Sequence, residues 1–424
     1  MSSTGIGRTR QSAIYQDGVS GRRPRVPTAF SRLEAKARGA MSRAAYAYMA
    51  GGAGGEATMA ANRAGFDAWR IVPRVLRDVS ERDTTVELFG RRIPAPLLLG
   101  PIGVLGLAHR EADVAVGRAA AAEGVPMVLS NQASRPMEEV AAVMGDAPRW
   151  FQLYWSTSNE LVESFVARAE ACGCEAIVVT LDTTLLGWRS RDLDLGSLPF
   201  ARGMGIAQYT SDPVFARLVQ ERIAAPPDEP SPRPTLGALR TLLALTAAHP
   251  GPLLANLRSP VPRAAVQTFL ATYSRPSLTW ADLTFLRERT RLPIVLKGIL
   301  HPDDARRALD EGMDGVVVSN HGGRQVDGAI SAIAALPGVV DAVGGRAPVL
   351  LDSGIRGGAD VFKARALGAT AVLLGRPYAY GLAIGGADGV RDVLRNVLAD
   401  FDLTMGLSGC ASATAIGPEA LVPA

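Results

Sequence analysis

Cysteine and histidine are scarce in this chain, which has three cysteines and four histidines among 424 residues. Cys172 and Cys174 lie one residue apart, and the third cysteine is far away in the sequence. An odd number of cysteines gives no disulfide framework and favours a reducing compartment. Because no histidine lies near the cysteine pair, we expect no metal site.

The sequence also lacks long apolar runs and a strong excess of either charge. No segment approaches the ~20 apolar residues that a helix needs to cross a bilayer, and no apolar stretch follows the first residues as a secretory signal would require. The net charge of +4 comes from 45 basic and 41 acidic residues spread along the chain. We therefore expect a cytoplasmic protein that binds neither a membrane nor nucleic acid.

The first residues differ in character from the rest of the chain. Residues 1–28 place several arginines among glycine, serine and proline, which predicts a loosely ordered basic arm. Composition is even from there on, which leaves one large domain with additions or two domains open. Of the two, we expect a single domain over residues 29–424. A helix is expected from Arg32 to Met49, and the glycine-rich residues 51–55 should end it and leave Tyr48 at its edge.

Eight short apolar runs recur along the chain, most of them followed by a turn and an alanine-rich segment. Eight βα units predict a (β/α)8 barrel, in which all strands end on one face. A doubly wound open sheet is the alternative, but no Gly-x-Gly-x-x-Gly follows the first run. The runs are Leu97–Leu99, Met127–Leu129, Trp150–Leu153, Ile177–Val179, Ile294–Leu296, Val316–Val318, Val349–Leu351 and Val372–Leu374. Intervening helices are expected at Glu111–Glu123, Asn159–Cys172, Pro302–Glu311 and Gly358–Leu367.

A long gap separates the fourth and fifth runs. It covers about residues 183–290 and includes a proline-rich tract at 226–234, which cannot form a helix or a central strand. We interpret the gap as an insertion after the fourth strand that forms an active-site loop or lid.

Polar, charged or glycine residues follow each of the eight runs. Lys297 follows the fifth run, and His321 and Arg324 follow the sixth. Histidine can accept a proton near neutral pH, and arginine can hold a carboxylate in a bidentate grip. Turn chemistry explains each such residue taken singly, but their convergence on one barrel mouth predicts a site for anionic ligands.

The turns after the last two runs favour phosphate. They contain Ser353, Gly354, Arg356, Gly375 and Arg376. Barrels often bind phosphate in these two turns, and exposed backbone N–H groups beside two guanidiniums make a suitable cradle. The sequence therefore predicts an organic cofactor that carries a phosphate group.

Several longer motifs resemble one known family, the FMN-dependent α-hydroxy-acid oxidases and dehydrogenases. The resemblance runs from about residue 30 to about residue 410. It implies a (β/α)8 barrel with FMN at its mouth, and a homotetramer or octamer. The motifs are FQLY (151–154), LKGI (296–299), SNHGGRQ (319–325), DSGIRGGADVFKA (352–364), LGRPYAYG (374–381) and the YMAGGAG that begins at Tyr48.

The resemblance also implies roles for individual residues. His321 would accept the substrate's hydroxyl proton, Asp182 would orient it, and Lys297 would stabilise the reduced flavin. The substrate would contact Tyr48, Tyr154, Arg189 and Arg324, although Arg191 could replace Arg189 as the second carboxylate clamp. FMN would be bound by Pro101, Ile102, Gly103, Ser130, Gln152, Thr180, Lys297, Ser319, Asp352, Ser353, Gly354, Arg356, Gly375 and Arg376.

Within this family, residues 187–204 (GWRSRDLDLGSLPFARGM) and 210–215 (TSDPVF) are similar to the lactate 2-monooxygenases. The similarity implies oxidative decarboxylation of an L-2-hydroxy acid with O2. An oxidase that releases the keto acid and H2O2 is the alternative. The polar residues Asn131 and Gln132 after the second run leave a larger, specialised substrate open.

Two alternatives come from other classes of protein. A sugar-phosphate isomerase or aldolase could use the same barrel with Lys297 as the Schiff-base residue. A non-catalytic FMN-binding barrel is the other. The joint presence of His321, Asp182 and two arginines argues against it, because a binding module needs no proton acceptor between carboxylate clamps.

Overall fold

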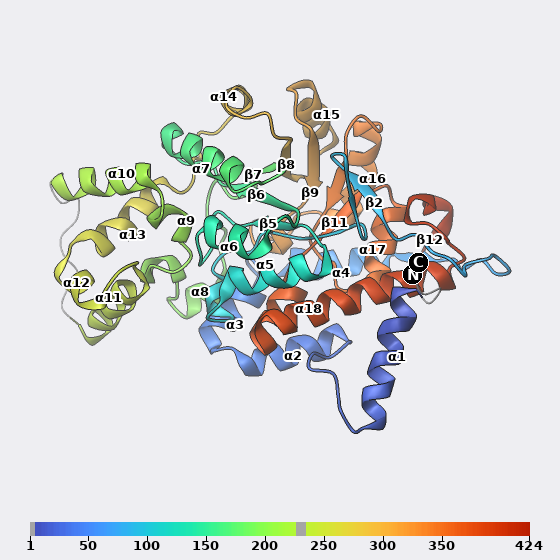
Figure 1. Ribbon diagram of the computed structural model, residues 1–424. Helices are drawn as coiled ribbons and strands as arrows, with labels where there is room; N and C mark the ends of the chain where they lie inside the picture. Colours follow the sequence, from blue (N-terminus) through green and yellow to red (C-terminus); the bar gives the residue numbers. More distant parts are fainter. Residues whose placement is uncertain (1–4, 226–234) are drawn as a thin grey trace.

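The computed structural model describes residues 5–225 and 235–424. At its centre, eight parallel strands close into a barrel in chain order, and the last strand pairs with the first (Figure 1). The predicted (β/α)8 barrel is therefore confirmed, and the open sheet is excluded. The strands are β4 (Leu97–Leu99), β5 (Met127–Leu129), β6 (Arg149–Leu153), β7 (Ile177–Thr180), β8 (Ile294–Ile299), β9 (Gly315–Val318), β10 (Val349–Leu351) and β11 (Ala371–Leu374).

The barrel strands are almost continuously apolar because both of their faces are covered. In β9 every residue is buried, and Val316, Val317 and Val318 pair with Val349, Leu350 and Leu351 of β10. Side chains pointing inward fill the barrel, whereas those pointing outward pack against the surrounding helices. Closure leaves no exposed strand edge in this sheet.

Helices surround the barrel (Figure 1). The four helices expected between strands are confirmed to within one residue at each end, as α5, α7, α15 and α17. The chain's longest described helix, α18, bends at Gly385 and Gly386, where the backbone leaves helical geometry. The surrounding helices are α5 (Ala112–Glu123), α6 (Met137–Met144), α7 (Asn159–Ala171), α15 (Pro302–Asp310), α16 (Ala332–Val343), α17 (Gly358–Ala366) and α18 (Arg376–Leu407).

The N-terminal region differs from its prediction in two places. Residues expected as a loosely ordered arm contain helix α1 (Ile6–Val19), and the N–H of Gly7 donates to the buried Asp402 of α18 at 2.8 Å. The single helix expected from residue 32 is divided into α2 (Phe30–Ala40) and α3 (Arg43–Ala50), because the Ser42 hydroxyl caps a new N-terminus there.

One helix and three short strands lead from α3 to the barrel. Helix α4 (Ala57–Asp67) is followed by β1 (Trp69–Ile71), which pairs with the C-terminal strand β12 (Leu421–Pro423). A hairpin of β2 (Val86–Leu88) and β3 (Arg91–Ile93) comes next. The ring of Phe89 in its turn lies 5.5 Å from that of Trp150 near the start of β6, and so covers the N-terminal end of the barrel.

The insertion after β7 is mostly helical rather than a loop, and α10 to α13 form a group beside the barrel (Figure 1). It packs on the barrel through Tyr209, whose ring centroid lies 5.0 Å from that of Phe165 of α7, and the Tyr209 ring also lies 4.8 Å from that of Phe269 within the insertion. The proline-rich tract at 226–234 lies outside the described residues. The helices are α8 (Ser190–Asp194), η2 (Pro199–Arg202, 3-10), α9 (Ala207–Thr210), α10 (Pro213–Ala224), α11 (Leu236–Ala248), α12 (Leu253–Arg258), α13 (Val261–Thr272) and α14 (Asp282–Arg287).

No helix within residues 5–225 and 235–424 has both the length and the apolar character of a membrane span.

The contact between α17 and α18 supplies a test of the fold. A Cβ atom added at Gly358 would lie 2.0 Å from the backbone nitrogen of Phe401, whereas one added at the exposed Gly39 would meet no atom within 4 Å. We expect Gly358→Ala to lower the free energy of unfolding by roughly 1–3 kcal/mol through overpacking. Gly39→Ala in α2 should leave it unchanged or raise it slightly. Thermal unfolding of both variants measures the difference, and equal melting temperatures would contradict the packing described.

Candidate active site

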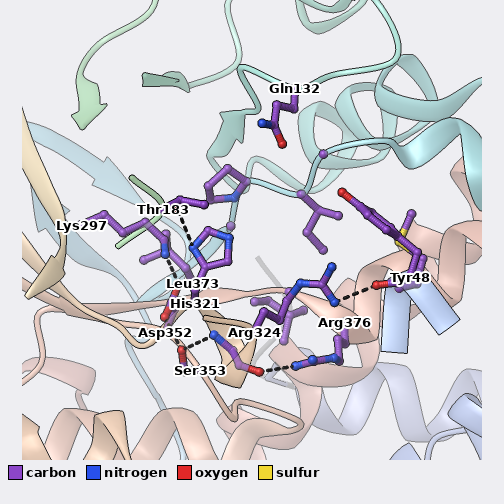
Figure 2. A pocket seen from close by; sticks show the side chains of 18 of the residues that line it. Tyr48, Gln132, Thr183, Lys297, His321, Arg324, Asp352, Ser353, Leu373 and Arg376 are labelled. Atoms are coloured by element: carbon purple, nitrogen blue, oxygen red, sulfur yellow. Dashed lines mark hydrogen bonds and ion pairs between the residues drawn. The ribbon is translucent and has the colours of Figure 1, made fainter. Parts of the chain in front are cut away.

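A cavity opens at the C-terminal ends of the barrel strands, and most of the predicted site residues line it (Figure 2). Five predicted residues lie outside the lining: Ser130, Gln152, Thr180, Asp182 and Ser319. The predicted residues that line it are Tyr48, Pro101, Ile102, Gly103, Tyr154, Arg189, Lys297, His321, Arg324, Asp352, Ser353, Gly354, Arg356, Gly375 and Arg376.

Three of those five residues form a buried hydrogen-bonded row across neighbouring strands. The Ser130 hydroxyl after β5 donates to the side-chain carbonyl of Gln152 at 3.1 Å, and the Gln152 amide donates to the Thr180 hydroxyl at 3.0 Å. All three side chains are buried. The row brings donors and acceptors from three strands together beside the cavity.

Lys297 of β8 provides a fixed positive charge at the cavity wall. Its ammonium lies 3.0 Å from the Asp352 carboxylate and donates to the Ser319 hydroxyl at 2.8 Å. Burial acts to lower its pKa, but the charges of Asp352 and Asp182 outweigh burial and raise the pKa. A Schiff-base lysine must be neutral to attack a carbonyl, so this environment disfavours the aldolase alternative.

His321 lines the cavity and pairs with Asp182 outside the lining, with His321 Nδ1 2.9 Å from Asp182 Oδ1. Burial acts to raise the pKa of Asp182, but His321 and Lys297 lower it to about 2. Burial lowers the pKa of His321, and Asp182 offsets this only in part. The carboxylate is therefore ionised and the imidazole neutral. If Nδ1 carries the proton toward Asp182, the other ring nitrogen is left to accept one.

The backbone at His321 is held in an uncommon conformation. His321 has a φ of 57°, and Gly322 and Gly323 follow with φ of 67° and 74°. A Cβ at Gly323 would lie 2.6 Å from the backbone nitrogen of Met59, so this turn requires glycine there. Strained conformations of this kind persist where the surrounding structure fixes them, and they cluster at functional sites.

Two arginines lie close to the Tyr48 ring, their guanidinium carbons 5.1 Å (Arg324) and 5.9 Å (Arg189) from its centroid. Arg324 donates to the Tyr48 and Gly51 carbonyls, both at 2.7 Å. Neither guanidinium has an ion pair with any described residue. Burial and the neighbouring Arg189 lower the pKa of Arg324 to about 9. Arg191 instead pairs with Glu56 at 2.6 Å and does not line the cavity.

Arg356 and Arg376 form a second positively charged group beside Ser353 and Gly354. The Nε atom of each arginine is buried and has no hydrogen-bond partner among the residues described. Burial and the charge of Arg376 lower the pKa of Arg356 to about 9, and burial also lowers that of Arg376. Buried charges without carboxylate partners are costly, so this group suits an anion such as phosphate.

Several lining residues escaped the sequence analysis. Phe200 and Tyr273 come from the insertion, which has no strand periodicity that could have placed them. Gln132 was noted only as an unusual polar residue. Thr183 directly follows Asp182, and its hydroxyl lies 3.4 Å from His321 Nδ1, so the strand-end pattern could have identified it. No group of metal-binding side chains occurs in the described part of the chain.

Comparisons with known proteins agree on one family. Residues 37–423 match the model of the FMN-dependent dehydrogenases. The FMN-dependent alpha-hydroxy acid dehydrogenase qulF of Penicillium citrinum is 44% identical over 94% of this chain and 92% of its own. An L-lactate oxidase of Lysinibacillus sphaericus is 40% identical over 91% and 90%. A crystal structure of mandelate oxidase with (S)-4-hydroxymandelic acid superposes with a TM-score of 0.76, at 37% identity over 93% and 98% of the two chains.

The environment of His321 makes its titration a direct test of this geometry. Because burial lowers its pKa, we expect the imidazole to remain neutral below the ordinary value of about 6.5. Asp182→Asn should lower that pKa further, since the carboxylate charge that favours the imidazolium is lost. Imidazole ¹⁵N resonances followed against pH measure both, with His321→Gln assigning the signal. A midpoint at or above 6.5 in the unsubstituted protein would refute the description.

Proposed function

This chain belongs to the family of FMN-dependent dehydrogenases, and we propose that it oxidises an L-2-hydroxy acid to the 2-keto acid with O2 as the final electron acceptor. The enzyme is an FMN-dependent α-hydroxy-acid oxidoreductase. The pairing of a neutral His321 with an ionised Asp182, in the same cavity as two arginines without ion pairs, carries the proposal. When bound, FMN accepts two electrons from the substrate and passes them to O2.

The cavity residues fit this cofactor. Arg356, Arg376 and the turn at Ser353 and Gly354 would hold the phosphate, because their buried guanidiniums have no other anion among the described residues. Lys297 would offset the negative charge that develops on the reduced ring system. Gly375 would join the phosphate cradle. The rest of the cofactor would be held by Pro101, Ile102, Gly103, Ser130, Gln152, Thr180, Ser319 and Asp352.

Arg189 and Arg324 would hold the substrate carboxylate. Each has hydrogen bonds to neutral acceptors, and a carboxylate between them would supply the negative charge they lack. Tyr48 and Tyr154 would hydrogen-bond substrate oxygens. Burial and Asp182 raise the pKa of Tyr154 to about 12, so its hydroxyl stays protonated and can donate. These contacts fix the carbon that is oxidised, which is catalysis by positioning.

His321 would then accept the proton of the substrate's 2-hydroxyl group. The hydrogen on the carbon that bears this hydroxyl would leave with its electron pair. The imidazolium that forms is stabilised by Asp182 at 2.9 Å, whose low pKa keeps its charge throughout. The carbonyl of the keto acid forms as the O–H and C–H bonds break. Both partners are therefore needed, one as the proton acceptor and the other as its counter-charge.

The insertion bears on the fate of peroxide. Phe200 and Tyr273 of the insertion line the cavity, and their rings stack at 6.5 Å, which supports the insertion's proposed role as a lid. A cavity covered in this way favours retention of the keto acid beside the peroxide. Retained peroxide would decarboxylate the keto acid, as in lactate 2-monooxygenases, so oxidative decarboxylation is the second candidate function. Release of H2O2 defines the oxidase.

We also propose a homotetramer or octamer in the cytoplasm. Exposed apolar side chains on the insertion, including those of Trp188, Leu239 and Leu254, support association of several copies. The three cysteines are free, which agrees with a reducing compartment.

Replacement of the proton acceptor tests the mechanism. We expect His321→Ala to retain FMN, because its imidazole is not part of the phosphate cradle, but to reduce the flavin about 10²–10⁴-fold more slowly with a 2-hydroxy acid. Stopped-flow absorbance without O2 measures the rate. His301→Ala, at an exposed helix cap, is the matched control and should match the unsubstituted enzyme. Unchanged reduction in His321→Ala would refute this role.

The reaction with O2 separates the two candidate functions. The purified enzyme is mixed in air with L-lactate and with larger 2-hydroxy acids, and flavin bleaching, H2O2 and CO2 are followed together. Bleaching with stoichiometric H2O2 and intact keto acid identifies an oxidase, whereas CO2 with little H2O2 identifies oxidative decarboxylation. Failure of every acid to bleach the flavin would refute 2-hydroxy-acid oxidation itself.

A further inference from the structure

Gln132 is a buried polar side chain that the proposed mechanism does not use. It follows β5, lines the cavity and is only 8% exposed. Its side-chain amide has no hydrogen bond to any of the described residues. Figure 2 shows it across the cavity from Ser353 and Arg376, with no dashed line to a neighbour. Neither amide atom is among the fully buried, unpartnered side-chain atoms of the described residues, so the amide is open to the cavity, where a ligand can reach it.

The backbone of Gln132 is held firmly, which fixes the point from which its side chain enters the cavity. Its N–H donates to the Ser130 hydroxyl at 3.1 Å, and its carbonyl accepts from the N–H of Val104 at 2.9 Å. A Cβ at Gly103 would lie 3.0 Å from the Gln132 Cβ, and one at Gly205 would lie 3.1 Å from the Gln132 carbonyl oxygen. The residue is thus enclosed on both sides and has little freedom to turn its backbone away.

Ser134 and Arg135, two and three residues after Gln132, anchor the same turn. The N–H groups of Ser134 and Arg135 donate to the buried carboxylate of Asp113 at 2.8 and 3.2 Å. The Ser134 hydroxyl accepts from the N–H of Gly106 at 2.9 Å. The turn that carries Gln132 is therefore pre-organised, as a residue that selects among ligands requires.

Aromatic side chains line the same cavity. The Phe200 ring lies 6.5 Å from Tyr48, edge to face, and 6.5 Å from Tyr273, stacked. Tyr154 also lines the cavity. Such surfaces favour a flat aromatic group by stacked and edge-to-face packing. The methyl group of lactate would cover little of this aromatic surface and would leave the Gln132 amide without a partner.

We propose that Gln132 determines specificity by hydrogen-bonding a polar substituent on the substrate, so that the preferred substrate is a 2-hydroxy acid with an aromatic side chain bearing a hydroxyl or carbonyl group. This inference rests on the proposed function, because the arginines must hold the carboxylate for the side chain to face Gln132. An amide offers both a donor and an acceptor. It can therefore bind either substituent.

Matched pairs of substrates test the preference in the complete FMN-loaded enzyme. The pairs are mandelate with 4-hydroxymandelate, and 3-phenyllactate with 3-(4-hydroxyphenyl)lactate. The second pair has one more methylene group, so the ring hydroxyl lies farther from the carboxylate than in the first pair. We expect kcat/KM for the hydroxylated member to exceed that of its partner by about tenfold in at least one pair, since a single hydrogen bond to a buried amide is gained. Equal values in both pairs would overturn the inference.

Substitution assigns the preference to this side chain. Gln132→Met keeps the length of the side chain but removes its hydrogen bonds, and we expect it to bring the ratio within each pair close to one. Gln267→Met makes the same chemical change at an exposed position of α13 and should leave the ratio as in the unsubstituted enzyme. Retained discrimination in Gln132→Met would overturn the assignment. Loss of bound FMN from that variant, with the ratio unchanged, would place the amide on the cofactor and overturn it too.

The outcomes distinguish failure of the specificity proposed for Gln132 from failure of the proposed 2-hydroxy-acid oxidation. If L-lactate and all four aromatic acids, hydroxylated or not, fail to reduce the flavin, 2-hydroxy-acid oxidation is refuted. If the unsubstituted acids and L-lactate reduce it as efficiently as the hydroxylated acids, only the specificity proposed for Gln132 is refuted.

Discussion

An excess of buried positive charge at one end of the barrel is the constraint on which the site depends. Arg189, Arg324, Arg356 and Arg376 line one cavity without carboxylate partners among the described residues, and Lys297 shares it with Asp352. Burying cations in this way is unfavourable for the protein alone. The lowered pKa values of Arg324 and Arg356 reflect that cost. The proposed binding of a phosphate and a carboxylate would supply the missing negative charge.

The same positive charge gives the ionisable groups of the site different protonation states. His321 and Lys297 lower the pKa of Asp182 and keep it ionised, while burial, with a smaller contribution from Lys297, lowers the pKa of His321. The imidazole can therefore accept a proton, while the carboxylate stays charged to stabilise the cation that results. The Lys297 ammonium keeps its own proton because two carboxylates raise its pKa more than burial lowers it. One network thus provides a base, a counter-charge and a permanent cation.

Much of this arrangement was predictable because the barrel repeats one local pattern. Each buried strand is a short apolar run of β-forming residues, and closure sends every strand end to the same face. Eight runs and the residues after them therefore identified the strands, four helices and most of the cavity lining. The break between α2 and α3 was missed because a single capping serine, Ser42, outweighs an otherwise continuous helical pattern.

The sequence by itself determined the barrel, the side chains at its mouth and the family, since all three follow from local runs and contiguous motifs. Tertiary structure decided which arginine enters the cavity: Arg189 does, because Glu56 holds Arg191 outside it. It also brought Phe200 and Tyr273 of the insertion over the mouth and left the Gln132 amide facing inward without a partner. These facts depend on contacts between distant segments, which no local periodicity encodes.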